Sequence, residues 1–220
     1  MKSPLKAAFA SLAALLLGLS LPEASADPVY LVELANFACP HCAHMEALDP
    51  RVAGAVKATG GVFDFAPVRS EKQNIDPELL YYASRNQGPA VAHVTRVLLF
   101  EAMHTDGEPI QSVTQGVVFL QQDWPKQGPA VDFQKMTADS ESPAVVRAAE
   151  RAQVLGLQEG VSRLPAFIFI QQGRPVAMVG RGPQYPSTPQ IQGAVLAEIK
   201  KLAHPRPPAP RNQTIARTRP

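Results

Sequence analysis

The chain has 220 residues, of which 45% are hydrophobic and 18% are charged, and its formal net charge is +2. So small a net charge argues against a surface that binds nucleic acid. The length and the hydrophobic fraction suit one domain with its own core, and only the N-terminal end has an apolar run near the length of a membrane span.

The first 26 residues have the pattern of a signal peptide. Lys2 and Lys6 precede an apolar run over residues 7–19, and the small residues 24–26 offer a cleavage site before Asp27. The apolar run is shorter than the ~20 residues that a spanning helix needs, although a retained N-terminal anchor stays open as an alternative. Such a segment directs export and is then removed, so the mature chain would begin at Asp27 and lie in an oxidising compartment where disulfides persist, which we expect to be a bacterial periplasm.

A strand, a helix and a second strand are predicted at the start of the mature chain. Residues 29–34 form a short apolar, β-branched run, and residues 62–68 form another. Between them, residues 39–59 carry apolar side chains at helical spacing and end at a glycine pair, while Asp49-Pro50 should kink or split that helix. This order predicts a βαβ unit.

Residues 72–160 are predicted to form a helical insertion. Few stretches here alternate with period two, and Gly and Pro residues separate the segments that have helical spacing. Helices are expected at residues 77–86, 90–104, 110–122, 130–138 and 142–157.

Strand patterns return after the insertion. Two apolar runs, residues 166–170 and 175–179, flank a turn that contains glycine and predict a hairpin. A last helix is expected over residues 188–203, with Thr188 as its N-cap. Residues 204–220 are rich in Arg and Pro and contain no acidic residue, so they are predicted to be a disordered tail.

Cys39 and Cys42 are the only cysteines of the chain, and Pro40 and His41 separate them. Such a pair can close into a disulfide and reopen, so it provides one possible redox switch. At a helix start, Cys39 would lie near unpaired N–H groups and the positive end of the helix dipole, which favour a thiolate. Pro40 needs no hydrogen-bond partner there, and His41 could donate a hydrogen bond to the sulfur or carry a positive charge. We therefore predict that Cys39 is the attacking thiol and Cys42 the resolving one.

Two motifs carry a resemblance to a known family. The segment from Phe37 to Cys42 after a first strand, and Leu164-Pro165 before the returning strand, resemble the DsbA family of periplasmic disulfide oxidoreductases. The resemblance implies an α/β, thioredoxin-like fold that a helical insertion domain interrupts. The expected division is residues 1–26 for the signal peptide, 27–71 and 161–203 for the thioredoxin-like domain, 72–160 for the insertion and 204–220 for the tail.

The resemblance also implies roles for residues around the cysteine pair. A cis peptide bond at Pro165 would face the pair and leave the backbone of Leu164 free to bind an extended substrate. Glu33 would lie beneath the cysteines and tune proton transfer to Cys42. Relatives commonly have a basic residue in the second strand, whereas this chain has Asp64 in that region, so an ion pair with Glu33 is in doubt. A trans edge proline and a solvent-exposed Glu33 stay open as alternatives.

The first hypothesis is an exported thiol:disulfide oxidoreductase that donates the Cys39–Cys42 disulfide to reduced exported polypeptides through a mixed disulfide. The resemblance implies re-oxidation by a DsbB-like membrane oxidase linked to quinone, and no cofactor, metal or nucleic acid is expected. A monomer is expected, because residues 27–36 leave no room for the N-terminal dimerisation domain of isomerases.

Two alternatives stay open. The same motif could serve a disulfide isomerase or reductase that another protein keeps reduced. A different class is a Cu(I)-binding or chaperone module, since soft thiolates suit Cu(I) and Met45 is close in sequence. His93 and His104 are expected to be ordinary surface or core histidines, while Trp124 and Phe133 are expected to fill the helical core.

Overall fold

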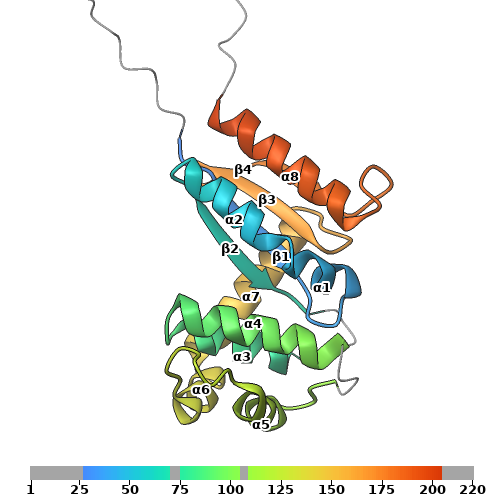
Figure 1. Cartoon of the computed structure of the whole chain (residues 1–220). Helices are drawn as coiled ribbons and strands as arrows, with labels where there is room; N and C mark the ends of the chain where they lie inside the picture. The colour runs from blue at the N-terminus through green and yellow to red at the C-terminus, as the bar shows by residue number, and fades with distance from the viewer. Residues whose placement is uncertain (1–26, 70–74, 105–108, 205–220) are drawn as a thin grey trace, which may run out of the picture.

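The computed structural model describes residues 27–69, 75–104 and 109–204, and its elements surround one sheet (Figure 1). The predicted signal peptide and nearly all of the predicted tail lie outside these residues. Among the helices that are described, none combines the length and the apolar character needed to cross a membrane.

The central sheet has four strands. They are β1 (Tyr30–Ala35), β2 (Val62–Pro67), β3 (Ala166–Gln171) and β4 (Arg174–Gly180). Their order is β2-β1-β3-β4, so β1 has a neighbour on each side. β1 pairs with β2 in parallel and with β3 antiparallel, which places Glu33 between Phe65 and Phe167. β3 and β4 form the predicted hairpin, with a bulge after Phe169.

Three helices cover one face of this sheet. They are α1 (Pro40–Glu46), α2 (Asp49–Ala58) and α8 (Thr188–Ala203). The separation of α1 from α2 confirms the break predicted at Asp49-Pro50. Leu31 of β1 and Phe167 of β3 pack in one core cluster with Met45 and Ile191, and all four side chains are fully buried. The apolar side chains that point to one face of the strands therefore pack against the apolar faces of α1 and α8, and together they form one core layer.

The five remaining helices lie between β2 and β3 in the chain. They are α3 (Asp76–Arg85), α4 (Pro89–His104), α5 (Val113–Asp123), α6 (Phe133–Ser140) and α7 (Pro143–Gln158). In Figure 1, α3 to α6 gather below the sheet, and α7 runs from them along the opposite face of the sheet. Leu80, Leu99 and Leu120 are fully buried in the core that these helices share with that face. This is the arrangement predicted for a thioredoxin-like sheet interrupted by helices.

Two of these helices, α5 and α6, begin three residues later than predicted. In each case a polar side chain caps the helix at the later position. The Ser112 hydroxyl accepts a hydrogen bond from the N–H of Gln115 at 3.1 Å, and Asp132 accepts one from the N–H of Lys135 at 2.9 Å.

The last helix begins at Thr188, as predicted, but Thr188 is not its N-cap. Ser187 is the N-cap, and its backbone N–H donates to the side-chain oxygen of Gln190 at 3.2 Å. The predicted cap is therefore wrong by one residue.

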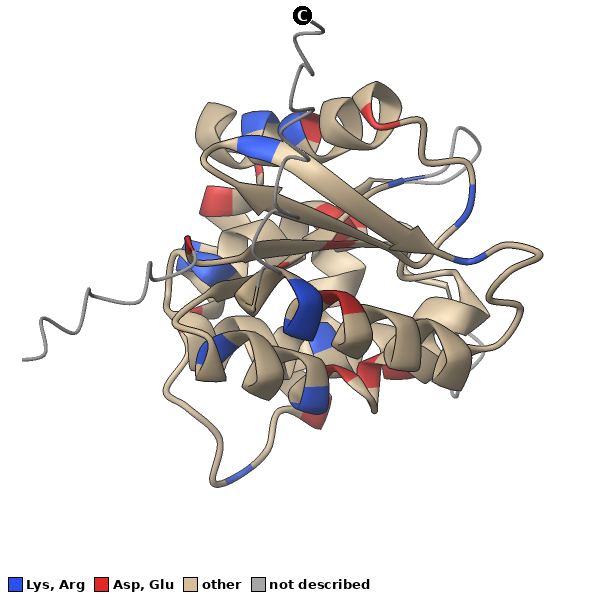
Figure 2. Cartoon of the chain, turned by 90° about the horizontal axis from the view of Figure 1, so that it is seen from above, with Lys and Arg blue, Asp and Glu red and all other residues tan. Residues whose placement is uncertain are grey.

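Charged side chains lie mostly on helices and loops (Figure 2). The described strands contain only Glu33, Asp64 and Arg174. Because β1 is buried from Leu31 to Ala35, a carboxylate in its middle must be stabilised by groups inside the protein.

Candidate active site

The two cysteines lie at the start of α1. Cys39 is the N-cap, with an extended backbone (φ −88°, ψ 114°), and Pro40 occupies the first helical position. Cys42 is 1% exposed, whereas Cys39 is half-buried. Both thiols are free in this structure. The helix start therefore presents one sulfur near the surface and keeps the other inside.

Several groups stabilise the anion of Cys39. Its sulfur accepts a hydrogen bond from the backbone N–H of Cys42 at 3.4 Å. The Cys42 thiol has the largest effect on Cys39, and together with the N–H groups of Cys42 and His41 and the charge of Arg181 it lowers the pKa to about 6, against the opposing effect of burial. A thiol with this pKa is mostly a thiolate at pH 7.

The pKa of Cys42 shifts in the opposite direction to that of Cys39, because Cys42 is more deeply buried. Burial raises the pKa of the Cys42 thiol well above its usual value, and the neighbouring Cys39 and Glu33 raise it further. The reduced pair therefore holds one proton, which resides on the inner sulfur. This asymmetry supports the predicted division between an attacking Cys39 and a resolving Cys42.

The loop before β3 brings Leu164 and Pro165 to the cysteine pair. The peptide bond between them is cis, as predicted. The Cys39 sulfur lies 3.8 Å from the carbonyl oxygen of Leu164 and donates a hydrogen bond to it when the thiol is protonated. The Pro165 carbonyl accepts a hydrogen bond from the N–H of Arg181 at 3.1 Å, which joins this loop to the end of β4.

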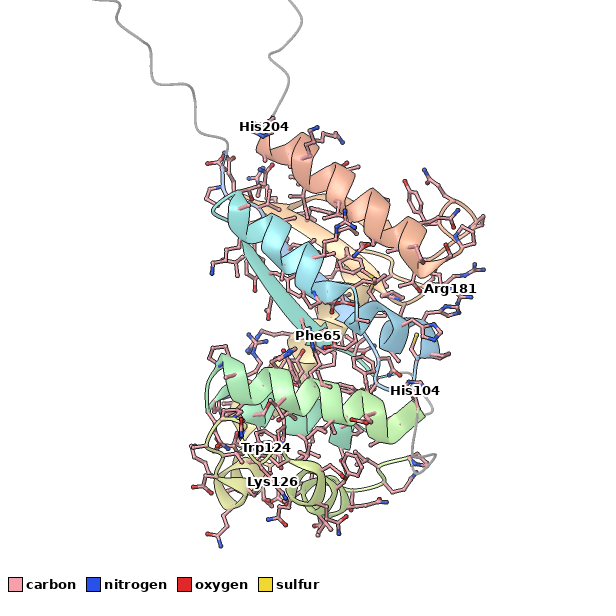
Figure 3. The ribbon with its side chains drawn as sticks, in the orientation of Figure 1. Phe65, His104, Trp124, Lys126, Arg181 and His204 are labelled. Carbon is pink, nitrogen blue, oxygen red and sulfur yellow. The ribbon has the colours of Figure 1, made fainter. Side chains whose placement is uncertain are left out.

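Arg181 is a candidate site residue that the motifs do not reveal. It is half-buried and lies at the same end of the molecule as α1 (Figure 3). Its charge lowers the pKa values of both Cys39 and His41. The predicted hairpin could have indicated the position of Arg181. Gly180, the last residue of β4, pairs with Ala166, so Arg181, the next residue along the chain, lies near Pro165.

The His41 side chain contributes less than predicted. Among the described residues, no hydrogen bond joins its imidazole to the sulfur of Cys39, and the stabilising group is its backbone N–H. Loss of hydration, followed by the charges of Arg181 and His44, lowers the pKa of His41. The imidazole is then mostly neutral at pH 7, so Arg181, and not a charged His41, supplies the positive charge near the thiolate.

Glu33 is 1% exposed, which excludes the alternative of a solvent-exposed glutamate. Burial raises the pKa of Glu33 well above its usual range, and the adjacent Asp49 carboxyl raises it further. No N–H group in the described part of the chain donates to either Glu33 oxygen. Burial and the Asp49 carboxyl therefore both favour the protonated form of Glu33.

The cation near these acids comes from the helical insertion. Arg96 of α4 is 7% exposed, donates to Glu46 at 3.0 Å and lies 3.3 Å from Asp49. Its guanidinium also lies over the ring of Phe65, 4.7 Å from the centroid. The only sign of this arginine in the sequence is a charge within the apolar run of residues 91–100.

Asp64 belongs to the second strand, in the region where relatives have a basic residue. Its partners are Arg85 and Tyr30, and not Glu33. It pairs with Arg85 at 3.0 Å and accepts a hydrogen bond from Tyr30 at 2.8 Å. The doubt about an ion pair between Glu33 and the second strand was therefore justified, because Arg96 of α4 provides the positive charge instead.

His104 connects the insertion to the loop that carries the cysteines. Its Nε2 lies 2.8 Å from the carbonyl oxygen of Phe37, and its ring stacks on Phe100. Figure 3 shows His104 at the end of the molecule where α1 lies. The last residue of α4 thus has a contact beside the site that the sequence did not indicate.

The fold has close counterparts among solved structures, although no family model and no curated protein matches the chain. DsbA from Xylella fastidiosa has a TM-score of 0.61 and 20% identity, over 80% of this chain and 87% of that one. The oxidoreductase NmDsbA1 from N. meningitidis has a TM-score of 0.60 and 20% identity, over 83% and 87%. DsbA from Pseudomonas aeruginosa has a TM-score of 0.59 and 17% identity, over 82% and 87%. The chain thus has the DsbA-like thioredoxin fold with a helical insertion, as predicted.

Proposed function

We propose that the chain is a thiol:disulfide oxidoreductase that donates the Cys39–Cys42 disulfide to reduced exported proteins. One observation carries the proposal. A half-buried sulfur with a pKa of about 6 and a buried sulfur that retains its proton lie one helical turn apart, facing the carbonyl of Leu164. The DsbA-like fold supports the same class of reaction.

The reaction would proceed in two exchanges. A substrate thiolate attacks the Cys39 sulfur of the closed disulfide, forms a substrate–Cys39 bond and expels Cys42 as a thiolate, which takes up a proton. A second substrate thiolate then attacks the substrate sulfur of this mixed disulfide, and Cys39 leaves as a thiolate. The substrate loses two electrons and gains a disulfide, and the protein ends as the dithiol form.

The lowered pKa of Cys39 sets the direction of electron flow. A pKa of about 6 lies one unit below pH 7, and each such unit stabilises the reduced protein by ~1.4 kcal/mol. This makes the couple ~30 mV more oxidising per unit. A better leaving group at Cys39 therefore favours donation of the disulfide over its acceptance.

The surroundings of Cys39 suit an extended polypeptide. The backbone of Leu164 precedes a strand of the sheet and faces the reactive sulfur, so a substrate segment could pair with it as an added strand. Export to the periplasm, action as a monomer and re-oxidation by a DsbB-like membrane oxidase linked to quinone complete the proposal, and they rest on the sequence resemblance.

Oxidation of a reduced, unfolded ribonuclease tests the proposed direction. We expect the oxidised protein to restore ribonuclease activity and the Cys39→Ser variant to be inactive. The redox potential of the Cys39–Cys42 pair, measured by equilibration with glutathione buffers, should be more oxidising than that of the glutathione couple itself. A protein that reshuffles scrambled ribonuclease but cannot oxidise the reduced form would be an isomerase, and the donor role would then be wrong.

The structure gives little support to a Cu(I) site at the pair. Met45, the soft ligand nearest in sequence, is fully buried in the core cluster on one face of the sheet. Its thioether is therefore not available beside the half-buried Cys39. Tight Cu(I) uptake by the reduced protein, without any oxidation of thiols, would favour this alternative.

A further inference from the structure

Two arginines from different loops lie beside the reactive sulfur. Arg163 directly precedes Leu164, whose carbonyl oxygen lies 3.8 Å from the sulfur of Cys39. Arg181 follows β4, and its backbone N–H donates to the Pro165 carbonyl at 3.1 Å. Figure 3 shows Arg181 at the end of the molecule where α1 lies. The backbone at which we expect a substrate to bind therefore has an arginine on each side.

Neither of these arginines has an acidic partner. Among the residues that the structure describes, no carboxylate lies within ion-pair distance of Arg163 or Arg181. Arg163 is exposed, and Arg181 is half-buried. After loss of hydration, the charges that lower the pKa of the nearby His41 are those of Arg181 and His44, and both are positive. The surface beside Cys39 thus has positive charge that no described acid neutralises.

The position of the two arginines gives this charge a use. Neighbouring strands lie about 4.8 Å apart, so an extended substrate that pairs with the backbone of Leu164 would lie within reach of both guanidinium groups. Oppositely charged side chains on neighbouring strands attract each other, whereas like charges repel. A substrate with carboxylates beside its cysteine would therefore be held with its thiol next to Cys39.

We propose that the protein selects extended polypeptide segments in which acidic residues flank the cysteine that is oxidised. Arg163 and Arg181 bind these carboxylates on the two sides of the substrate thiol. The inference rests on the proposed thiol:disulfide exchange and names the class of substrate. Opposite charge also speeds the encounter of the two molecules, and lysines at the same substrate positions slow it.

Three reduced peptides of equal length test the inference. Each contains two cysteines, with Glu, Gln or Lys on both sides of the first. Acid quenching and mass spectrometry give the rate at which the oxidised protein converts each peptide to its disulfide. Flanking charges also change the pKa of the peptide thiol itself, so each rate is divided by the rate of that peptide with uncharged hydroxyethyl disulfide. At low ionic strength we expect the corrected rate to be about tenfold higher for the acidic than for the basic peptide.

Charge reversal at Arg163 should remove this selectivity. Arg163 is not one of the groups that shift the pKa of Cys39, whereas Arg181 is, so Arg163 is the better position for the test. In Arg163→Glu the ratio of acidic to basic rates should fall to about one or below, and in Arg163→Gln it should fall by about threefold. The rate with the Gln peptide reports any change in the reactivity of Cys39 itself.

Two controls separate this effect from the general charge of the protein. Arg174 is also exposed, but it begins β4 whereas Arg181 follows the end of that strand, so the length of β4 separates them. Arg174→Glu makes the same change in net charge and should leave the ratio as it is. Salt at about 0.5 M should reduce the ratio in the unaltered protein, because it screens exposed charges.

The outcomes distinguish this inference from the proposed function. Equal corrected rates for the three peptides at low salt would overturn the selectivity and leave the exchange reaction intact. An unchanged ratio in folded Arg163→Glu and Arg163→Gln, or an equal fall in Arg174→Glu, would overturn it as well. If the oxidised protein converts none of the peptides, the proposed thiol:disulfide exchange is itself rejected.

Discussion

The sulfur of Cys39 lies 3.8 Å from the carbonyl oxygen of Leu164, although 125 residues separate the two in the chain. The contact exists because the cysteines follow β1, Leu164 precedes β3, and these strands are antiparallel neighbours. The reactive sulfur therefore lies beside a backbone segment that a substrate can pair with.

Serine substitutions should separate the roles of the two sulfurs. Cys42→Ser should accumulate a mixed disulfide between Cys39 and a substrate, because no resolving thiol remains, whereas Cys39→Ser should form none. Mass spectrometry after incubation with a reduced peptide and an oxidant measures both. Equal trapping by the two variants would contradict the assignment of Cys39 as the outer, attacking sulfur.

The stability of the reduced protein should depend on pH through Cys39. Its pKa is about 6 in the folded protein and near 8.5 in an unfolded chain, so between these values the unfolded state binds one more proton. The free energy of unfolding of the dithiol form should therefore rise from pH 6 to pH 8.5 and be lost as pH falls through 6. Denaturant unfolding, compared with that of Cys39→Ser, checks this. A flat difference between the two proteins across that window would refute the lowered pKa.

Removing the charge of Arg181 should raise the pKa of Cys39. For Arg181→Ala we expect an increase of roughly half a unit to one unit, which makes the couple ~15–30 mV less oxidising. Ultraviolet absorbance of the thiolate as a function of pH measures the shift. Arg181→Lys, which retains the charge, should stay near the original value, and high salt should reduce the difference because Arg181 is only half-buried.

Replacement of Arg96 should destabilise both redox forms. Arg96→Met leaves Asp49 and Glu46 buried without their cation, and we expect a loss of about 3–5 kcal/mol in the free energy of unfolding. Arg85→Met is the control, since its pair with Asp64 is far more exposed and should cost about 1 kcal/mol or less. Similar losses of the free energy of unfolding in the two variants would show that the buried cluster around Arg96 stabilises the protein no more than the exposed pair does.

Local patterns were enough to predict most of the fold. The strands show their period of two or their β-branched runs, and Asp49-Pro50 marks the break between α1 and α2. Helix starts were less accurate where the apolar pattern extends past a capping side chain, as it does before Ser112 and Asp132. A cap depends on which side chain reaches a free N–H group, and hydrophobic spacing does not record that.

The candidate site was only partly predictable, for a similar reason. The cysteine motif and Leu164-Pro165 are contiguous in sequence, so they could be recognised. Arg96 and His104 reach the site from α4, and no local pattern indicates where the end or the inner face of that helix will pack. Of the two roles that the sequence allowed for the His41 side chain, a positive charge is disfavoured, because loss of hydration and then the charge of Arg181, which comes from another part of the chain, lower its pKa.

The insertion between β2 and β3 also has a consequence for the newly made chain. Glu33 of β1 finds its partner Phe167 only after all five inserted helices have been synthesised. Until then the two cysteines are present, but Leu164 and Arg181 are not beside them, so the charge of Arg181 does not yet lower the pKa of Cys39. The backbone segment that a substrate would meet beside Cys39 is therefore completed only when the final hairpin docks on β1.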